Sequence, residues 1–596
     1  MSRHILVALI LALTLLSSCV PKAAVTTSPT QEGPVASETP VSYSTEPTML
    51  GITTTATAPP VIHVYAPGSI QAAVDLASAG DTVFVHQGIY DQAVKVTTSG
   101  ITIRGENGSI LDGSIFPTPP PLSPPPRTPA PAAGIALLPG VTGVTIENLE
   151  IRNFPGPAIV LSAPLVADPS LESPHGNTIQ NNVSANCSQG ILLASTYDNL
   201  IKANRLTNSR AAGIVLRESP NNRIIGNHVD GSIAAGINVA SNSTGNLIQG
   251  NVILASNLDG ITISNANANQ VLKNQVSESG RNGVSAYSSN DTLIEVNTVT
   301  NSGRSPDPNY GDGITISNSG SARVLKNQVS TSTRNGIAVY VSNGVVVDGN
   351  TVSHTVGRPR DPDPNVNPSG GFGIILYKAN GAQVSWNSVS SSTRHGIPVY
   401  SSNDTLIEMN TVSESGLGLD PSFSDGIKVE NCNSSRLLNN WVSGSRGSGM
   451  GSYTSNNITI KDNAISNTGG SPNRGNGINL WKTNNAVISG NIVSGSAGHG
   501  VTLNTVADSR VEKNDVSRSA LAGINSYLGK RGVLVQNKVT ASGDYGIRMF
   551  GGSTSNNIEK NVVSGSGIYD LCDTSYPVAN YWADNEYFTT SPPNLD

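Results

Sequence analysis

Acidic, basic and aromatic side chains recur around a repeated glycine in the second half of the chain. Asp312 and Asp425 each directly precede a Gly-Ile pair, and Arg394-His395 precedes another. Proton abstraction beside a sugar carboxylate needs a cation that neutralises the carboxylate, with an acid and a base on opposite faces of the ring. The expected catalytic set is Arg394 as carboxylate clamp, His395 as base or acid, Tyr340 or Tyr400 as its partner, and Asp312 or Asp425 as orienting groups.

Two other interpretations of these charges stay open. Acidic and basic groups on neighbouring strands could pair with each other on a solvated face, which adds little stability. A carboxylate pair such as Asp312 with Asp425 would instead indicate hydrolysis, if the separation leaves room for a water molecule. The residue types alone do not choose between these alternatives.

Aromatic residues gather at one position, four residues after the glycine, although they make up only 5% of the chain. Alternation along a strand points this position outward, where stacked rings could hold the faces of sugar rings. Packing on a neighbouring turn, or the ordinary preference of tyrosine for strands, would also explain it. The expected substrate-binding set comprises Tyr287, Tyr377, Tyr453 and Trp481, the lysines Lys378 and Lys482 that follow two of these rings, and Arg334.

The elements that position these side chains follow from an internal repeat. From about residue 177, a phrase of the form N-x-V-S followed by G-I-x-[IVL] recurs in steps of 23 residues or a little more. Each unit holds three short stretches of alternating β-branched residues and no helical period, so it forms three strands. One unit cannot bury its apolar face alone, whereas stacked units share a continuous core. The repeat therefore predicts an all-β solenoid, the parallel β-helix.

An asparagine column accompanies the repeat. We expect it to be structural and not catalytic, because asparagine tolerates the left-handed backbone conformation and stacked amides can bond along a column. The column comprises Asn at 181, 204, 227, 251, 274, 297, 327, 350, 387, 410, 440, 463, 491, 514, 537 and 561.

Extra residues enter every second unit, always just before the Gly-Ile strand. The inserts span residues 303–310, 357–371, 416–424 and 469–474. They must leave the solenoid at one edge, roughly 9–10 Å apart, and loops gathered on one edge commonly border a binding face. The phrase SSNDTLIE(V/M)NTV occurs at 288–299 and again at 401–412, so a block of four units is duplicated.

The first residues predict export. An apolar run over residues 5–16 is too short to span a bilayer and is typical of a signal peptide. Small residues directly before Cys19 match the bacterial lipobox, which predicts lipidation of Cys19; a plain signal peptide with an incidental cysteine is the alternative. We expect a signal peptide at 1–18, a lipid-anchored Thr/Ser/Pro-rich linker at 19–60 and the β-helix at 61–596, outside the cytoplasm. No later segment reaches membrane-spanning length, so membrane contact is expected through the anchor alone.

Both ends of the predicted solenoid resemble known families. The passage SIQAAVDLASAGDTVFVHQGIYDQAVKV, which begins at Ser69, resembles the first segment of pectate-lyase-like right-handed β-helix proteins, where an amphipathic helix covers the open end. Residues 569–585 resemble the ending of NosD-type β-helix repeat proteins and imply a C-terminal cap at about 568–596. These resemblances imply a right-handed helix with an N-terminal capping helix. The proline-rich run itself indicates an exposed loop at 117–133. They imply a fold and not an activity.

Two coils are similar to coils of mannuronan C5-epimerases. Arg394-His395-Gly396-Ile397 resembles an Arg-His-Gly coil of the substrate groove in that family, and Leu258-Asp259-Gly260 resembles another coil. The catalytic Asp-Pro-His-Asp/Glu motif of those epimerases is missing from this chain. The resemblance therefore implies a polysaccharide groove without naming its catalytic residues.

The composition of the chain limits the classes of ligand that it could bind. A net charge of −6 without a basic cluster argues against nucleic acid, and four cysteines without a Cys/His cluster propose no metal site. Calcium is the one cofactor considered, through Asp312, Asp361 and Asp363. We expect action on a long acidic polysaccharide by lyase or epimerase chemistry, with hydrolysis next; the alternative is a non-catalytic glycan-binding or adhesive solenoid. A NosD-like accessory factor for metal-centre assembly lacks the expected ligands, and the oligomeric state is left open.

Overall fold

The computed structural model describes residues 59–117, 132–162, 172–307, 309–357, 370–418, 424–470, 475–575, 580–593 and 595. The predicted signal peptide, Cys19, nearly all of the linker and most of the 117–133 loop lie outside these residues. Within the described residues, no helix is long and apolar enough to cross a membrane.

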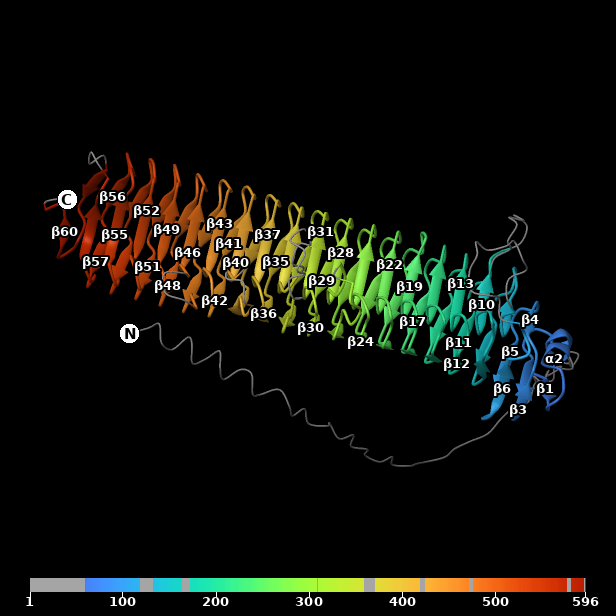
Figure 1. Cartoon of the computed structure of the whole chain (residues 1–596). Helices are drawn as coiled ribbons and strands as arrows, with labels where there is room; N and C mark the ends of the chain where they lie inside the picture. Colours follow the sequence, from blue (N-terminus) through green and yellow to red (C-terminus); the bar gives the residue numbers. More distant parts are fainter. Residues whose placement is uncertain are drawn as a thin grey trace, which may run out of the picture. The chain divides into compact units, whose positions relative to one another are not determined.

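The chain from residue 59 onward winds as a solenoid in which each regular coil contributes one strand to each of three parallel sheets (Figure 1). One coil consists of β23 (Gln270–Leu272), β24 (Gln275–Ser277) and β25 (Val284–Tyr287). Sheet A runs from β1 (Val61–Val64) to β59 (Tyr581–Ala583), and sheet B from β3 (Gly88–Tyr90) to β57 (Val562–Ser564). Each strand pairs in parallel with its equivalent in the next coil, as Val276 does with Val299. The predicted parallel β-helix is confirmed.

Sheet C carries the strands that follow the repeated glycine. Its strands are β4 (Val94–Val96), β7 (Ile135–Leu137), β10 (Ile159–Ser162), β13 (Ile191–Ala194), β16 (Ile214–Arg217), β19 (Ile237–Ala240), β22 (Ile261–Ser264), β25, β28 (Ile314–Ser317), β31 (Ile337–Tyr340), β34 (Ile374–Tyr377), β37 (Ile397–Tyr400), β40 (Ile427–Glu430), β43 (Met450–Tyr453), β46 (Ile478–Trp481), β49 (Val501–Asn504), β52 (Ile524–Tyr527), β55 (Tyr545–Phe550), β58 (Tyr569–Asp573) and β60 (Thr590–Ser591). The first and third residues of the four-residue strands face the core, as fully buried Ile261 and Ile263 show. The second and fourth residues therefore belong to the outer face.

The repeated glycine is required by close approach and not by a turn. A Cβ atom added to Gly260 would lie 2.2 Å from Val276 Cγ1 and 2.7 Å from the carbonyl oxygen of Gly283, in the next coil. The same contact recurs along the column, so stacked coils can interlock at this corner only without a side chain.

Gly260→Ala is therefore expected to lower the free energy of unfolding by about 1–3 kcal/mol, because the backbone carbonyl of the next coil cannot move aside. Gly320→Ala is the matched control, since the nearest neighbours of its added Cβ lie at 3.6 Å. Chemical unfolding followed by circular dichroism measures both variants. Equal stability of the two would show that the column does not need glycine.

The asparagine column is a hydrogen-bonded ladder at the corner between sheets A and B. Asn297 donates from Nδ2 to Asn327 Oδ1 over 2.9 Å, and the backbone N–H of Asn297 donates to the same oxygen. The left-handed conformation expected for these asparagines is present at Asn181, with φ 55°, and is wrong for the other fifteen, where it belongs to the preceding residue, as in Val296 with φ 57°. The ladder also begins at buried Asn182 and not at Asn181, and it continues to Asn585.

The N-terminal end is covered by the predicted helix, α2 (Ile70–Leu76). Ser69 caps it by accepting a hydrogen bond from the N–H of Ala72 over 3.1 Å, and Ile70 and Val74 are buried against the first coils. At the other end, β58, β59 and β60 add further strands to sheets C and A, and buried Trp582 joins the core. The region of the predicted C-terminal cap thus continues the solenoid.

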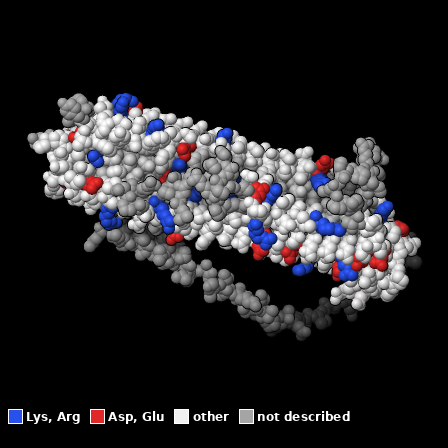
Figure 2. Space-filling view, viewed as in Figure 1, with Lys and Arg blue, Asp and Glu red and all other residues white. Residues whose placement is uncertain are grey.

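On the face that Figure 2 shows, Lys and Arg lie in small groups with Asp and Glu over a largely uncharged surface. The pairs are mostly exposed, as in Arg531 with Asp508 at 2.6 Å, and such pairs contribute little to stability.

Candidate functional site

All four inserts lie at the corner that leads from sheet B into sheet C. Their described parts directly precede β28, β34, β40 and β46, which are alternate strands of sheet C. The expectation that the inserts share one edge is confirmed. The outer face of sheet C is therefore the surface that they border.

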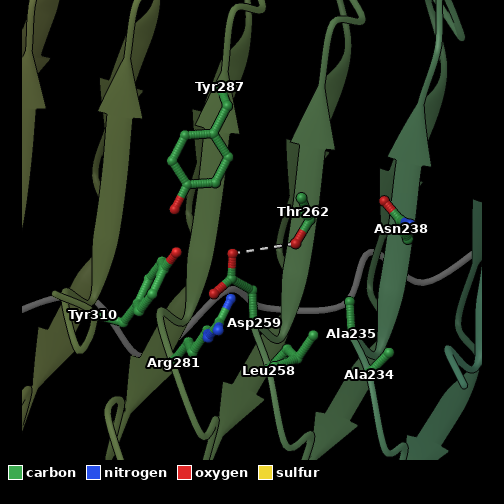
Figure 3. A pocket seen from close by; sticks show the side chains of 9 residues that line it. All are labelled: Ala234, Ala235, Asn238, Leu258, Asp259, Thr262, Arg281, Tyr287 and Tyr310. Carbon is green, nitrogen blue, oxygen red and sulfur yellow. Dashed lines mark hydrogen bonds between the residues drawn. The ribbon is translucent and has the colours of Figure 1, made fainter. Parts of the chain in front are cut away.

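A cavity of about 420 Å³ opens on this face beside the first insert (Figure 3). Asp259 directly precedes Gly260, the repeated glycine before β22. Arg281 comes from the next coil, Tyr287 from the end of β25, and Tyr310 from the insert itself. Figure 3 shows the tyrosine rings and the carboxylate converging from three coils. The remaining lining comes from Ala234, Ala235, Asn238, Leu258 and Thr262.

Charged groups hold the insert in place at this cavity. The guanidinium carbon of Arg281 lies 4.0 Å from the centre of the Tyr310 ring, and its Nη2 lies 3.9 Å from Asp307 Oδ2. The sequence analysis identified Asp259 only through the coil that resembles one of the mannuronan C5-epimerases, and it did not identify Tyr310. An aromatic residue at the end of an insert, one coil after an arginine, is the signal that could have found the pair.

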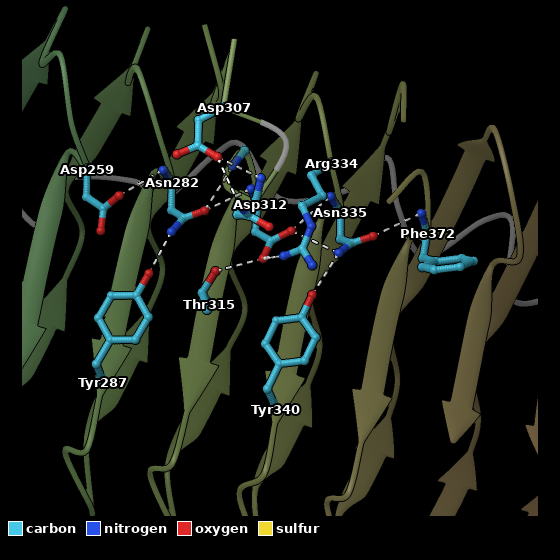
Figure 4. A network of polar contacts seen from close by, with 12 residues as sticks. Asp259, Asn282, Tyr287, Asp307, Asp312, Thr315, Arg334, Asn335, Tyr340 and Phe372 are labelled. Carbon is cyan, nitrogen blue, oxygen red and sulfur yellow. Dashed lines mark hydrogen bonds and ion pairs between the residues drawn. The ribbon is translucent and has the colours of Figure 1, made fainter. Parts of the chain in front are cut away.

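The residue before each repeated glycine forms what we call the pre-glycine row. In this row the side chain of one coil accepts the backbone N–H of the next: Asn282 N donates to Asp259 Oδ1 over 2.9 Å, and Asp312 N donates to Asn282 Oδ1 over 3.0 Å. Asn335 N then donates to Asp312 Oδ1 over 3.1 Å (Figure 4). Aspartate and asparagine alternate here because the side chain of each places an Oδ1 acceptor within hydrogen-bond distance of the backbone N–H in the next coil.

Histidine takes the same role further along the row. His395 Nδ1 accepts the N–H of Asp425 over 2.9 Å, and Asp425 Oδ1 accepts the N–H of Ser448 over 2.8 Å. His499 Nδ1 accepts the N–H of Ala522 over 3.0 Å. The Nδ1 atom of each imidazole must be unprotonated to accept this hydrogen bond, so these contacts favour the neutral form of both histidines.

Burial shifts the titration of the row. Burial raises the pKa of Asp312, against the lowering effect of Arg334, whose Nη1 lies 2.9 Å from Asp312 Oδ2. Burial also raises the pKa of Asp425. Burial, then the charges of Lys428 and Arg394, hold the pKa of His395 well below its usual range. The structure thus places Asp312, Asp425 and His395, three members of the predicted catalytic set, beneath the surface.

The carboxylate pair considered for hydrolysis is not a pair. Asp312 and Asp425 occupy the row four coils apart, with Asn335, Phe372 and His395 between them. At about 4.8 Å per coil the separation is roughly 19 Å. Carboxyl groups that hydrolyse glycosidic bonds lie about 5–9.5 Å apart, so this pairing is excluded.

Tyr287, Tyr340 and Tyr453 turn back toward the pre-glycine row. Their hydroxyls lie 2.8 Å from Asn282 Nδ2, 3.0 Å from Asn335 Nδ2 and 2.9 Å from Asp425 Oδ2. These three rings are half-buried and do not stand outward. Tyr287 and Tyr453 were expected in the binding platform, and Tyr340 as a catalytic partner. Figure 4 shows the first two hydroxyls at the row.

A small residue lies two positions before each of these tyrosines and makes room for the ring. A Cβ on Gly451 would lie 2.4 Å from the Tyr453 ring, and Ser285 and Ala338 occupy the equivalent positions. Tyr400 follows Pro398 at the same spacing and packs, with Tyr340, against a cluster of Ala338, Phe372 and Ile375. The small residue before each tyrosine was the available sequence signal.

Two of the predicted binding rings remain open. Tyr377 is 39% exposed and Trp481 is 37% exposed, and the ammonium groups of Lys378 and Lys482 lie 5.3 Å and 4.4 Å from the respective ring centres. Tyr527 is also 37% exposed but is followed by Leu528.

On this face the acidic side chains are mostly buried and the basic ones are at least partly exposed to solvent. Asp259, Asp312 and Asp425 are buried, whereas the basic side chains reach the solvent: Lys378 and Lys482 are exposed, and Arg281, Arg334 and Arg394 are partly exposed. Glu430 is the partly exposed acid of these strands, and it lies 2.9 Å from Lys428 Nζ. Arg394 stacks at 5.6 Å from the Phe372 ring centre. The outer surface of sheet C therefore offers rings and cations more than acids.

Several solved structures are similar to this chain at low sequence identity. A double mutant of the periplasmic alginate epimerase AlgG matches at 16% identity over 56% of this chain and 80% of that chain, with a TM-score of 0.35. PfbA, a surface adhesin of Streptococcus pneumoniae, matches at 12% identity over 66% and 87%, with a TM-score of 0.38. A mutant of the PL6 family alginate lyase AlyGC matches at 11% identity over 89% and 100%, with a TM-score of 0.34. No curated protein matches.

Two family models match the sequence. The model of the right-handed β-helix region matches residues 419–563, and that of the periplasmic copper-binding protein NosD matches 142–309, 258–425 and 364–472. The described residues do not fit copper, because no three His, Cys, Asp or Glu side chains among them form a group that could hold a metal ion. The described cysteines Cys187, Cys432 and Cys572 are buried separately. Since its matches together span residues 142–472, more than half of the sequence, the chain belongs to the NosD family.

Proposed function

We propose that the outer face of sheet C binds an anionic polysaccharide outside the cytoplasm. The observation that carries the proposal is the sorting of charge by depth: the carboxylates of the pre-glycine row are buried acceptors, while Lys378, Lys482 and Arg281 reach the surface beside aromatic rings. An exposed ring offers its face to a sugar ring, and an ammonium or guanidinium group beside it attracts a sugar carboxylate or sulfate.

Binding is favoured over catalysis because the titratable groups are already engaged. His395, Asp312 and Asp425 are buried, and each holds a backbone N–H group of the next coil, so they lie beneath the surface that a polysaccharide would contact. Arg394 lies beside this row and contributes positive charge to the face. The family description and the predicted signal peptide with Cys19 support a periplasmic or lipid-anchored location.

Lyase or epimerase chemistry at the cavity is the second candidate. The cavity brings the Arg281 guanidinium and the Tyr287 and Tyr310 rings together with buried Asp259. Burial, then the charges of Asp259 and Asp312, raises the pKa of Tyr287, so its hydroxyl stays protonated near neutral pH and could serve as an acid but not as a base. Arg281 would neutralise a sugar carboxylate in such a reaction. Calcium has no described ligand set here, and Asp361 and Asp363 lie outside the described residues.

The test is a titration of the full exported chain with alginate, polygalacturonate and chondroitin sulfate, and with a neutral glucan, at low and high salt. We expect the anionic polymers to bind, with affinity that falls as salt rises, and the glucan not to bind. Equal binding of the glucan, or no binding of any polymer, would contradict the proposal. Formation of unsaturated sugar ends that Arg281→Ala abolishes would instead establish lyase activity, part of the second candidate. Epimerase activity would appear as a changed uronate composition in the NMR spectrum of the recovered polymer.

A further inference from the structure

We propose that Tyr377–Lys378 and Trp481–Lys482 form two equivalent subsites that a single anionic polysaccharide chain spans. The inference rests on the proposed function and adds to it where the polymer lies and how long it must be. Each pair consists of the last residue of a sheet C strand and the corner residue that follows, in β34 and in β46. We call these the two ring–lysine pairs.

Each ring–lysine pair presents an apolar surface and a cation together. The exposed fractions of the two rings are nearly equal, 39% and 37%, and each lysine ammonium lies within 5.3 Å of its own ring centre. A cation held there meets an acidic substituent on a sugar whose ring stacks on the aromatic face. The same combination recurs at no other described end of a sheet C strand, since the other aromatic ends are followed by Ser, Val, Thr, Leu or Gly.

The lysines occupy a backbone conformation that disfavours them. Lys378 and Lys482 have φ of 53° and 49°, in the left-handed region, where non-glycine residues are uncommon and Asn and Asp are enriched. The corner residues of the other described coils are mostly Ser, Asn or Thr, as at Ser288 and Asn318. Among the described corners that directly follow a sheet C strand, lysine occurs at these two positions alone.

The two pairs lie in one column. The strand register runs from Tyr377 to Tyr400, Glu430, Tyr453 and then Trp481, which is four coil steps. At about 4.8 Å per step the two rings are roughly 19 Å apart along the solenoid. The duplicated phrases at 288–299 and 401–412 are offset by the same four coils, so the second pair is the duplicate of the first.

The surface between the pairs suits an extended chain. Tyr400 and Tyr453 are half-buried, and Lys428 Nζ lies 5.4 Å and 4.9 Å from their ring centres. Lys428 also forms an ion pair with Glu430. The middle of the column therefore carries a paired lysine between the half-buried rings of Tyr400 and Tyr453. No described insert residue belongs to this column, because the inserts enter at the opposite ends of the strands.

Chain length follows from this spacing. A disaccharide reaches one ring–lysine pair only, whereas an octasaccharide reaches both and gains from the high effective concentration of its second half. We therefore expect an octamer of galacturonate to bind at least about tenfold more tightly than the dimer. We also expect Lys378→Gln or Lys482→Gln to cost the octamer about tenfold, because either change ends the bridging and leaves one intact pair. The double variant should lose further affinity, because no intact pair remains.

The experiment is isothermal titration of the full exported chain and its variants with galacturonate and mannuronate oligomers of defined length. Tyr527→Ala is the matched control: it removes an equally exposed ring of the same column that lacks a lysine, and it should leave affinity within about twofold. Equal affinity of dimer and octamer, or single lysine variants in which the octamer keeps its tenfold advantage over the dimer, would overturn the two-subsite proposal while leaving polysaccharide binding intact. Absence of binding by every oligomer and by the intact polymers would overturn the proposed function as well.

Discussion

Asn297→Ala is expected to lower the free energy of unfolding by about 2–5 kcal/mol, because it leaves two buried backbone groups without the partner that the amide supplies. Asn297 Oδ1 accepts the N–H of Asn274 over 2.9 Å, and its Nδ2 donates to the carbonyl of Val271 over 2.8 Å. The amide also bonds to Asn327 in the next coil. One change therefore interrupts the ladder in both directions.

Hydrogen exchange of the backbone amides measures this effect coil by coil, which suits a solenoid whose coils contact only their neighbours. We expect faster exchange in the coils of Asn274 and Asn327. Thr298→Ala is the control, because Thr298 is exposed on the adjacent strand and its loss should change stability by no more than about 0.5 kcal/mol. Unchanged protection in the Asn297 variant would mean that the ladder does not stabilise the stack.

Acid is expected to loosen the solenoid around His395 and His499. The pKa of His395 is held well below its usual value in the folded state, and that of His499 is lowered to about 4. For a folded pKa below the unfolded value of about 6.5, the stabilisation is complete above pH 6.5 and is lost as pH falls toward 4. Each histidine then costs up to about 1.4 kcal/mol for every pH unit in that window.

His395→Asn is the informative variant, because asparagine already serves as the acceptor at Asn282 and Asn335. It keeps an acceptor for the Asp425 N–H but does not titrate. We expect the wild-type protein to lose protection of the Asp425 amide between pH 6.5 and 4, and the variant to lose less. If the two proteins respond to acid identically, His395 Nδ1 is not the group that acid disrupts.

The fold was predictable because its signals repeat. A period of about 23 residues with three strand-like stretches allows few packings other than a parallel β-helix, and Ser69 with Ile70 and Val74 marks the capping helix. The left-handed residue was misplaced by one position, since Val296 and Asn297 both lie at the same corner. The backbone dihedral angles are needed to tell that Val296 has the left-handed conformation and that Asn297 makes the hydrogen bonds.

The candidate site was predictable in part. Alternation correctly assigns Tyr287 and Tyr377 to the outer face, but it does not say whether a ring stands out or lies along the strand. That difference depends on the residue two positions earlier and on a hydroxyl partner such as Asn282. The buried position of His395 likewise depends on a backbone N–H of the next coil, which sequence spacing does not reveal.

Insert loops were placed correctly because their position in the repeat is fixed. The cavity was not predicted, since it needs Arg281 and Tyr310 from different coils to stack at 4.0 Å. By contrast, the distance between Asp312 and Asp425 could have been obtained by counting coils, which excludes the hydrolytic pair without any structure.

The most direct test of the proposed binding face uses the fluorescence of Trp481. Trp386 and Trp441 are exposed away from sheet C, and Trp582 is buried near the C-terminal end, so a Trp386→Phe/Trp441→Phe variant leaves Trp481 as the exposed tryptophan. We expect polygalacturonate to shift and quench its emission, with the same salt dependence as binding. Binding of the polymer without any change in Trp481 emission would contradict the account, because the polysaccharide would then lie elsewhere.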